Sequence, residues 1–225
     1  MCPDGIRVVG FGDSLTAGLK VERSSRFVMK LVGLIQGARR GFWVDFRDAG
    51  RSGDTYASAL SRLTSDVLSA NPDVTIVEFG SNDAIETPID QFPATMDALL
   101  DPLTKVCPIT LVTDIPYKAR WYGNWNQETA PFNQAIAAGA QRHHAILVSF
   151  SQIFRAEAAR GDWDLFVHDT PYDESLPDTQ WQGDIHPNAA GNELMATTLA
   201  QAILKATEPS VIVTTSDEAT LSRAP

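Results

Sequence analysis

Four short polar segments, far apart in the chain, hold the side chains that could do chemistry. They are Gly12-Asp13-Ser14-Leu15-Thr16, the run from Asp48 to Thr55 that contains Gly53, Gly80-Ser81-Asn82-Asp83, and Asp184-Ile185-His186-Pro187-Asn188. A serine hydroxyl becomes a nucleophile when a histidine removes its proton, and the histidine can later protonate the leaving group. Brought together by the fold, these segments would suit nucleophilic catalysis.

Ser14 follows directly after the predicted strand Ile6 to Phe11. The carboxyl end of a strand in an open α/β sheet is where ligands bind, so this position favours a chemical role. Serine is also a common helix cap, and on this segment alone capping is an equal alternative. Asp13 and Asp83 are expected to hold the turns beside Ser14 and Asn82 rather than to act as acids or bases.

Gly53 and Asn82 are candidates for hydrogen-bond donors to an oxyanion. Gly53 stands just before a predicted helix start, where a residue without Cβ can present its N–H to a ligand. Asn82 follows the third predicted strand and carries two amide hydrogens. Each has a simpler explanation as a turn residue. Because both follow strand ends, they should reach the sheet edge that carries Ser14, and together they form a set of oxyanion donors.

His186 lies at the junction between a loop and the last predicted helix. Pro187 steers the preceding residue toward an extended conformation and itself suits the first helical turn. A histidine held in this way at the sheet edge can take the proton of Ser14 and return it to a leaving alkoxide.

Strands and helices alternate along the chain and must position these segments. The predicted strands are Ile6 to Phe11, Val44 to Arg47, Val74 to Phe79, Ile109 to Thr113 and Ala145 to Phe150. The predicted helices are Ser24 to Gln36, Thr55 to Ser69, Asp90 to Thr104, Thr129 to Arg142, Ser151 to Ala159 and Asn188 to Ala206. This alternation predicts an α/β protein, a three-layer α/β/α sandwich with a five-stranded parallel sheet in the order 2-1-3-4-5.

Two segments interrupt the alternation, Tyr117 to Glu128 and Asp162 to Gly183, and both are predicted as long loops. Long loops in a compact domain are more often functional than accidental. Trp121 and Trp125 lie in the first loop, and Trp181 lies in the second. These rings could line a pocket for an acyl, aryl or sugar group, or they could close a hydrophobic lid, and the sequence leaves both open.

Composition limits the class of protein. With 225 residues, 44% of them hydrophobic, the chain predicts a single domain over residues 1–207 and a mobile tail over residues 208–225. A formal charge of −10 argues against nucleic acid and anionic membrane surfaces as partners. Neither a membrane span nor a signal peptide is seen, so we expect a cytoplasmic protein, with a trimmed secreted protein as the alternative.

No metal or cofactor is expected. His143, His144 and His168 lack a metal-ligand pattern, and Cys2 and Cys107 have neither metal nor redox spacing. The sequence also lacks Gly-x-Ser-x-Gly and the common phosphate-binding glycine loops, which argues against the α/β-hydrolase fold and against nucleotide binding.

In this order, the four polar segments resemble the blocks of the SGNH hydrolase superfamily, also called GDSL esterases and lipases, over positions 12 to 188. The resemblance implies a flavodoxin-like sandwich. It also implies Ser14 as the nucleophile and His186 as the base. The oxyanion hole would consist of the N–H groups of Ser14 and Gly53 and the side chain of Asn82.

The acid of the triad departs from this pattern. In the family it stands three residues before the histidine, a position that Gly183 occupies here, and the nearest carboxylate is Asp184. If the segment is extended, Asp184 and His186 share a face, so we expect Asp184 to orient His186. The alternatives are Asp178 and a backbone carbonyl, such as that of Gly183.

The resulting prediction is a serine esterase that hydrolyses small carboxylic esters through an acyl-serine intermediate, without a cofactor. The family includes short-chain esterases, thioesterases, lysophospholipases and carbohydrate deacetylases, so small acyl esters are the default. An acyltransferase or a carbohydrate acetylesterase with the same acyl-serine site remains an alternative. So does a non-catalytic binding domain of the same fold, because the usual Asp-x-x-His is missing. The oligomeric state is left open.

Overall fold

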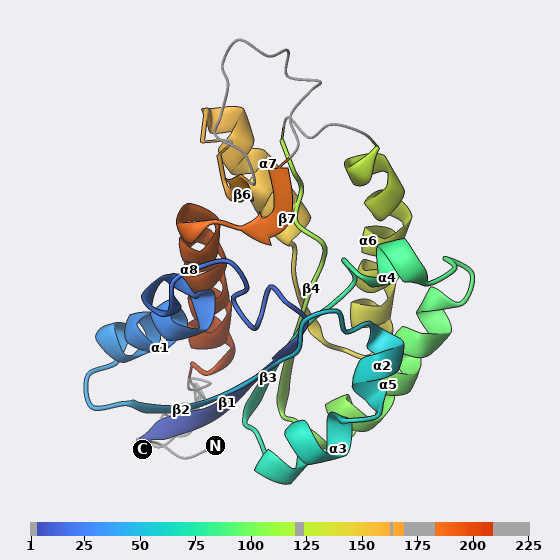
Figure 1. The fold of residues 1–225 in the computed structure, drawn as a ribbon. Helices are drawn as coiled ribbons and strands as arrows, with labels where there is room; N and C mark the ends of the chain where they lie inside the picture. Colours follow the sequence, from blue (N-terminus) through green and yellow to red (C-terminus); the bar gives the residue numbers. More distant parts are fainter. Residues whose placement is uncertain (1–3, 120–123, 163, 169–182, 209–225) are drawn as a thin grey trace, which may run out of the picture.

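A five-stranded parallel sheet forms the centre of the molecule in the computed structural model, which describes residues 4–119, 124–162, 164–168 and 183–208 (Figure 1). The strands are β1 (Gly5–Gly12), β2 (Trp43–Gly50), β3 (Val74–Glu78), β4 (Ile109–Thr113) and β5 (Ile146–Val148). Their order is β2-β1-β3-β4-β5, and every neighbouring pair is parallel, which confirms the predicted topology.

Burial along the strands explains their sequences. Every residue of β3 and β4 is buried, as the apolar runs in these segments predict for strands covered on both faces. The edge strand β2 instead alternates between partly buried and exposed positions over most of its length. The inner strands therefore carry the hydrophobic core, and the edge strand faces solvent.

One face of the sheet is covered by α1 (Phe27–Ala38), α7 (Phe150–Arg160) and α8 (Ala189–Ala206), whose apolar residues join one core cluster. Helix α8 packs an apolar stripe against the sheet, since Met195, Leu199 and Ile203 recur at helical spacing and are fully buried. Asn188 caps this helix by accepting hydrogen bonds from the backbone N–H groups of its first turn.

The other face is covered by four helices whose apolar residues form a second core cluster. They are α2 (Tyr56–Leu60), α3 (Leu63–Asp66), α5 (Phe92–Val106) and α6 (Trp125–Arg142). Another short helix, α4 (Asp83–Glu86), directly follows Asn82.

The predicted helix Thr55 to Ser69 is wrong as a single element. It is divided into α2, α3 and a 3-10 turn, η2 (Leu68–Ala70). The break falls at Ser61 and Arg62, where the chain leaves the helical path. Arg62 turns its side chain into the protein instead of toward solvent, so an uninterrupted surface helix does not form.

The two predicted loops also need correction. Helix α6 begins at Trp125, inside the predicted loop Tyr117 to Glu128, because the Trp125 ring packs in the core and the Asn126 side chain bonds both backbone groups of Lys118. The predicted loop Asp162 to Gly183 contains β6 (Phe166–His168), which forms a two-stranded antiparallel ribbon with β7 (Gly183–Pro187), a strand that begins at the last residue of that loop. The three residues of β6 are too few to give a sequence signal, and its partner lies across a long intervening segment.

Candidate active site

Strand register brings three of the polar segments to one edge of the sheet. Gly12, at the end of β1, pairs with Gly50 of β2 and with Glu78 of β3. The loops that follow these strands carry Ser14, Gly53 and Asn82. The common direction of the strands therefore accounts for the meeting of residues far apart in sequence.

His186 lies between Ser14 and Asp184. Its Nε2 is 2.8 Å from Ser14 Oγ, although the two residues are 172 positions apart. Its Nδ1 forms a short hydrogen bond with Asp184 Oδ1, and the same oxygen accepts the backbone N–H of His186 at 3.0 Å. All three side chains are buried. This arrangement can draw a proton from the serine while a carboxylate fixes the imidazole.

The extended strand β7 explains how Asp184 reaches His186. Residues two positions apart in a strand project to the same face, so an acid two residues before the histidine contacts it directly. Asp178, an alternative acid, lies outside the described residues, and so do the aromatic candidates Trp121 and Trp181.

Lys20 provides a second partner for Asp184. Its ammonium group forms a short ion pair with Asp184 Oδ2, the oxygen that does not face the histidine. Burial alone would raise the pKa of Asp184, but the hydrogen bonds from Lys20 and His186 outweigh it and lower that pKa to about 2. The carboxylate is therefore ionised throughout the neutral pH range. Sequence reasoning missed Lys20, because a lysine in a loop gives no sign of its partner.

Two backbone N–H groups are available for an oxyanion. Within the described part of the chain, the N–H groups of Ser14 and Gly53 make no hydrogen bond to another protein atom. Gly53 has a φ of +82° and is exposed, and a Cβ built there would meet no atom within 4 Å. Glycine is therefore favoured at this position by its backbone angle rather than by crowding.

The Asn82 amide is already engaged inside the protein. Its Nδ2 donates to the backbone carbonyl of Asp54 at 3.0 Å and to Asp13 Oδ2 at 3.2 Å. These bonds hold the side chain beside the segment that contains Gly53. An oxyanion would have to compete with one of these acceptors, and the longer contact is the weaker of the two.

Beneath the serine lies a buried pair of carboxyl groups, Asp13 and Glu78. Asp13 Oδ1 accepts the N–H of Leu15 at 2.8 Å, and Glu78 Oε2 accepts the hydroxyl of Thr16 at 2.9 Å. Burial raises the pKa of Asp13 to about 7, and burial together with the charge of Asp13 raises the pKa of Glu78 well above its usual value. The pair therefore retains a proton near neutral pH.

Asp13 and Asp83 hold turns, as the sequence predicts. Asp13 binds the backbone of Leu15 in the turn of Ser14. Asp83 accepts the backbone N–H of Tyr56 with both carboxylate oxygens, at 3.2 Å each, and so connects the turn of Asn82 to helix α2. Burial raises the pKa of Asp83 to about 6, although the bond from Tyr56 opposes this shift.

Arg62 joins three segments of the site from inside the protein, with only 5% of its surface exposed. Its Nε lies 2.6 Å from Asp54 Oδ2, its Nη1 donates to the carbonyl of Ala49 at 2.7 Å, and its Nη2 donates to the carbonyl of Gly12 at 3.0 Å. The guanidinium carbon also lies 4.5 Å from the centroid of the Phe11 ring. The sequence gives no indication of this role, because Arg62 lies within a predicted helix, where an arginine usually faces solvent.

Of the three tryptophans predicted to line a pocket, Trp125 belongs to the described residues, and it is buried, with 8% of its surface exposed. The ammonium group of Lys118 lies 4.0 Å from the centroid of its ring, in the geometry of a cation–π interaction. Burial lowers the pKa of Lys118 to about 6, although the charge of Asp184 opposes this shift. Lys118 is therefore a second amine, besides Lys20, that interacts with Asp184.

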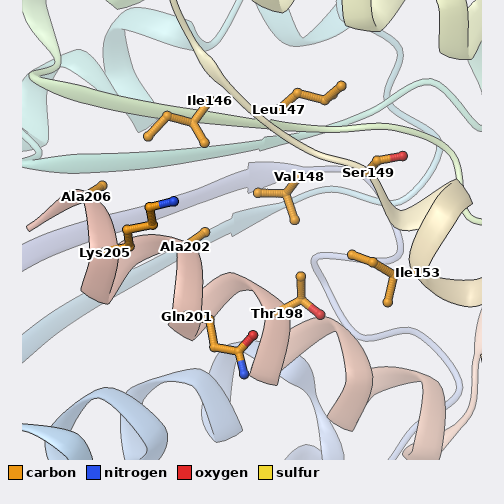
Figure 2. A pocket seen from close by; sticks show the side chains of 10 residues that line it. All are labelled: Ile146, Leu147, Val148, Ser149, Ile153, Thr198, Gln201, Ala202, Lys205 and Ala206. Carbon is orange, nitrogen blue, oxygen red and sulfur yellow. The ribbon is translucent and has the colours of Figure 1, made fainter.

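A groove of about 640 Å³ lies elsewhere, between β5 and α8 (Figure 2). Ile146, Val148 and Ala202 are among the residues that line it, and Ser14, Asn82 and His186 are not.

Among the described residues, no group of three or more His, Cys, Asp or Glu side chains could hold a metal ion. No helix in that part of the chain is long and apolar enough to cross a membrane.

An α/β/α sandwich with this strand order, and with serine, histidine and asparagine at the carboxyl edge of its sheet, defines the SGNH class of hydrolases. The family model of the GDSL-like lipases and acylhydrolases matches residues 11–194, and the chain belongs to this family. It is a hydrolase of the SGNH type, and membership implies a small-molecule ester as substrate. No curated protein matches the chain.

Solved structures with this fold include esterases. An acetyl xylan esterase named AlAXEase has a TM-score of 0.69 and 21% identity, with 88% of this chain and 100% of that chain covered. The acetylxylan esterase Axe2 from Geobacillus stearothermophilus has a TM-score of 0.66 and 17% identity, with 88% and 94% covered. A protein assigned to the lipolytic G-D-S-L family of Desulfitobacterium hafniense DCB-2 has a TM-score of 0.63 and 21% identity, with 87% and 98% covered. At these identities the likeness concerns the fold alone.

Proposed function

We propose that the protein is a serine esterase that hydrolyses small carboxylic esters through an acyl-serine intermediate. The observation that carries this proposal is the 2.8 Å contact between Ser14 Oγ and His186 Nε2, with Asp184 bonded to the other ring nitrogen. In this arrangement the carboxylate keeps the proton on Nδ1, and Nε2 is left to accept the proton of the serine.

In the first half of the reaction, Ser14 Oγ attacks the ester carbonyl carbon as its proton moves to His186 Nε2. The carbonyl oxygen becomes an oxyanion, which the N–H groups of Ser14 and Gly53 stabilise. Asn82 adds a third donor when its amide exchanges a protein acceptor for the oxyanion. The tetrahedral intermediate then collapses, and the imidazolium of His186 protonates the departing alkoxide to give an alcohol.

In the second half, water takes the place of the alcohol. His186 removes one proton from the water, whose oxygen attacks the acyl carbon of the acylated serine. Collapse of the second intermediate breaks the bond to Ser14 Oγ, which recovers its proton from His186. A carboxylic acid leaves, and the residues return to their starting state without a cofactor.

The substrate class that we propose to test first is acetyl esters of carbohydrates. Support comes from the names of two fold relatives, both acetylxylan esterases, although they share about a fifth or less of their residues with this chain. Simple acyl esters remain the broader alternative. Transfer of the acyl group to an alcohol needs the same serine, and added alcohol would reveal it as a new ester product.

A fluorophosphonate probe tests the nucleophile without a known substrate. We expect mass spectrometry to find one adduct, on Ser14, in the wild type, and none in Ser14→Ala. Ser69→Ala, which changes an exposed serine outside the site, should label like the wild type. In parallel, p-nitrophenyl acetate and acetylated xylo-oligosaccharides should be hydrolysed by the wild type and not by Ser14→Ala. An unlabelled, inactive wild type would favour a binding domain of the same fold.

A further inference from the structure

The two oxygens of Asp184 have different partners, and this division carries an inference that rests on the proposed esterase function. Oδ1 accepts both the backbone N–H and the ring nitrogen Nδ1 of His186. Oδ2 forms the ion pair with Lys20. The carboxylate of Asp184 therefore lies between the imidazole of His186, which must gain and lose a proton in the proposed reaction, and the positive charge of Lys20.

Lys20 belongs to the loop of the nucleophile. Its neighbour Leu19 donates its backbone N–H to the carbonyl of Ser14 at 3.0 Å. Lys20 itself has a φ of +64°, a left-handed conformation that is unfavourable for a residue with a side chain. The ion pair thus connects the turn of Ser14 to strand β7 across 164 positions of sequence, and it helps to offset the cost of that conformation.

Charge explains what Lys20 would do for the histidine. Without a compensating cation, the negative charge of Asp184 favours the protonated imidazole, the form that cannot act as a base. The positive charge of Lys20 opposes this effect. Among the described residues, the pair also faces the neutral hydroxyl of Ser14 and the buried Lys118, whose pKa of about 6 leaves it charged only at the acid end of the pH range.

We propose that Lys20 is a positioning residue for the esterase reaction, which holds Asp184 in register with His186 and extends hydrolysis to lower pH. Removing the charge should let Asp184 favour the protonated imidazole, so a higher pH is then needed to free the base. Because the Lys20 side chain is 39% exposed, solvent screens the interaction. We expect a displacement of about half to one pH unit.

The experiment compares the pH dependence of kcat/KM in the wild type, Lys20→Met and Lys20→Arg. The acid limb of the Lys20→Met profile should move to higher pH by about half to one unit, while its plateau stays within a few fold of the wild type. Lys20→Arg should retain the wild-type limb. Lys30→Met is the matched control, since Lys30 forms an ion pair with Glu193 outside the site and its loss should leave the profile unchanged.

A structural role without an electrostatic one predicts a different result, in which Lys20→Met lowers kcat/KM equally at every pH and leaves the limb in place. That result, or a profile that superimposes on the wild type, would overturn the proposal. An NMR titration of the His186 ring in the wild type and in Lys20→Met should give the same displacement without any turnover. The titration keeps the two hypotheses apart, because failure of the esterase function appears as an active Ser14→Ala or an inert wild type.

Discussion

The guanidinium of Arg62 donates a hydrogen bond to the carbonyl of Gly12, 50 positions earlier in the chain, at 3.0 Å. Through this bond and its contacts with Asp54 and Ala49, one buried cation fixes the ends of β1 and β2 and the segment after Gly53. The two strand ends and the loop that carry Ser14 and Gly53 therefore depend on a buried residue that bonds neither of them.

Arg62→Met should destabilise the protein by about 3 to 5 kcal/mol, because it leaves the Asp54 carboxylate buried without its cation. Chemical denaturation monitored by circular dichroism would measure this loss. The double variant Arg62→Met, Asp54→Asn should recover part of it, since the remaining carboxylate partner of Arg62, Asp66, is 25% exposed and can be solvated. A single variant as stable as the wild type would show that solvent reaches Asp54 and that the ion pair contributes little.

Asp184→Asn should lower kcat by roughly 10⁴, because the amide cannot hold the histidine in the tautomer that leaves Nε2 free. Steady-state kinetics on p-nitrophenyl acetate would measure the change, and thermal melting would confirm that the fold is kept. Asp178→Asn is the matched control and should keep full turnover. The opposite pattern would identify Asp178 as the acid, and full activity in both variants would favour a backbone carbonyl.

Gly53→Ala should affect both the stability of the fold, through backbone strain, and kcat, through the position of the Gly53 N–H. A left-handed alanine costs about 1 to 2 kcal/mol, or the loop relaxes and moves its N–H. In either case we expect kcat to fall by about 10²-fold, in line with the loss of one oxyanion donor.

Gly41→Ala is the control for this strain, because Gly41 has a φ of +78°, is equally free of neighbours around a Cβ, and lies between α1 and β2, outside the site. It should lose comparable stability in denaturation experiments and keep its turnover. Equal losses of kcat in both variants would contradict the donor role of Gly53.

The buried carboxyl pair predicts a pH dependence of stability. Because burial raises the pKa of Asp13 to about 7 and that of Glu78 well above its usual value, this pair binds more protons in the folded protein than in the unfolded chain above about pH 4. The contribution of the pair to the free energy of unfolding should therefore decrease as pH rises from about 4 to 7, whereas the lowered pKa of Lys118 acts in the opposite direction above about pH 6. Glu78→Gln removes one of the two groups and should flatten this decrease by roughly half.

Urea denaturation at pH 5 and pH 8 would test this prediction. Glu22→Gln, a change at an exposed glutamate, is the control and should keep the wild-type dependence. An unchanged slope in Glu78→Gln would mean that the pair does not hold its proton in solution.

The sequence predicted what depends on local pattern. Apolar runs located β1, β3 and β4 to within a residue at each end, and the rule that parallel strands end at one edge brought Ser14, Gly53 and Asn82 together. Pro187 correctly indicated the extended backbone that places Asp184 beside His186. These features depend on the periodicity, turn chemistry and backbone restrictions of neighbouring residues.

What the sequence could not predict depends on contacts between distant residues. Arginine and lysine are residue types usually found at solvated surface positions. Only the assembled fold supplies the carboxylate and carbonyl partners of Arg62 and Lys20. Glu78 was read as part of an apolar strand, with no sign of its pairing with Asp13. Strand β6 cannot be predicted from the sequence, because three residues carry too little pattern to distinguish a strand from a loop.

Asp184 and His186 belong to the same five-residue strand, β7, whereas Ser14 follows β1 of the main sheet. A small displacement of the ribbon would carry Asp184 and His186 together and leave their mutual bond intact. The same displacement would separate Nε2 from Ser14 Oγ. A displacement of the β6–β7 ribbon should therefore lower the turnover rate before it changes any spectroscopic signal from the whole domain.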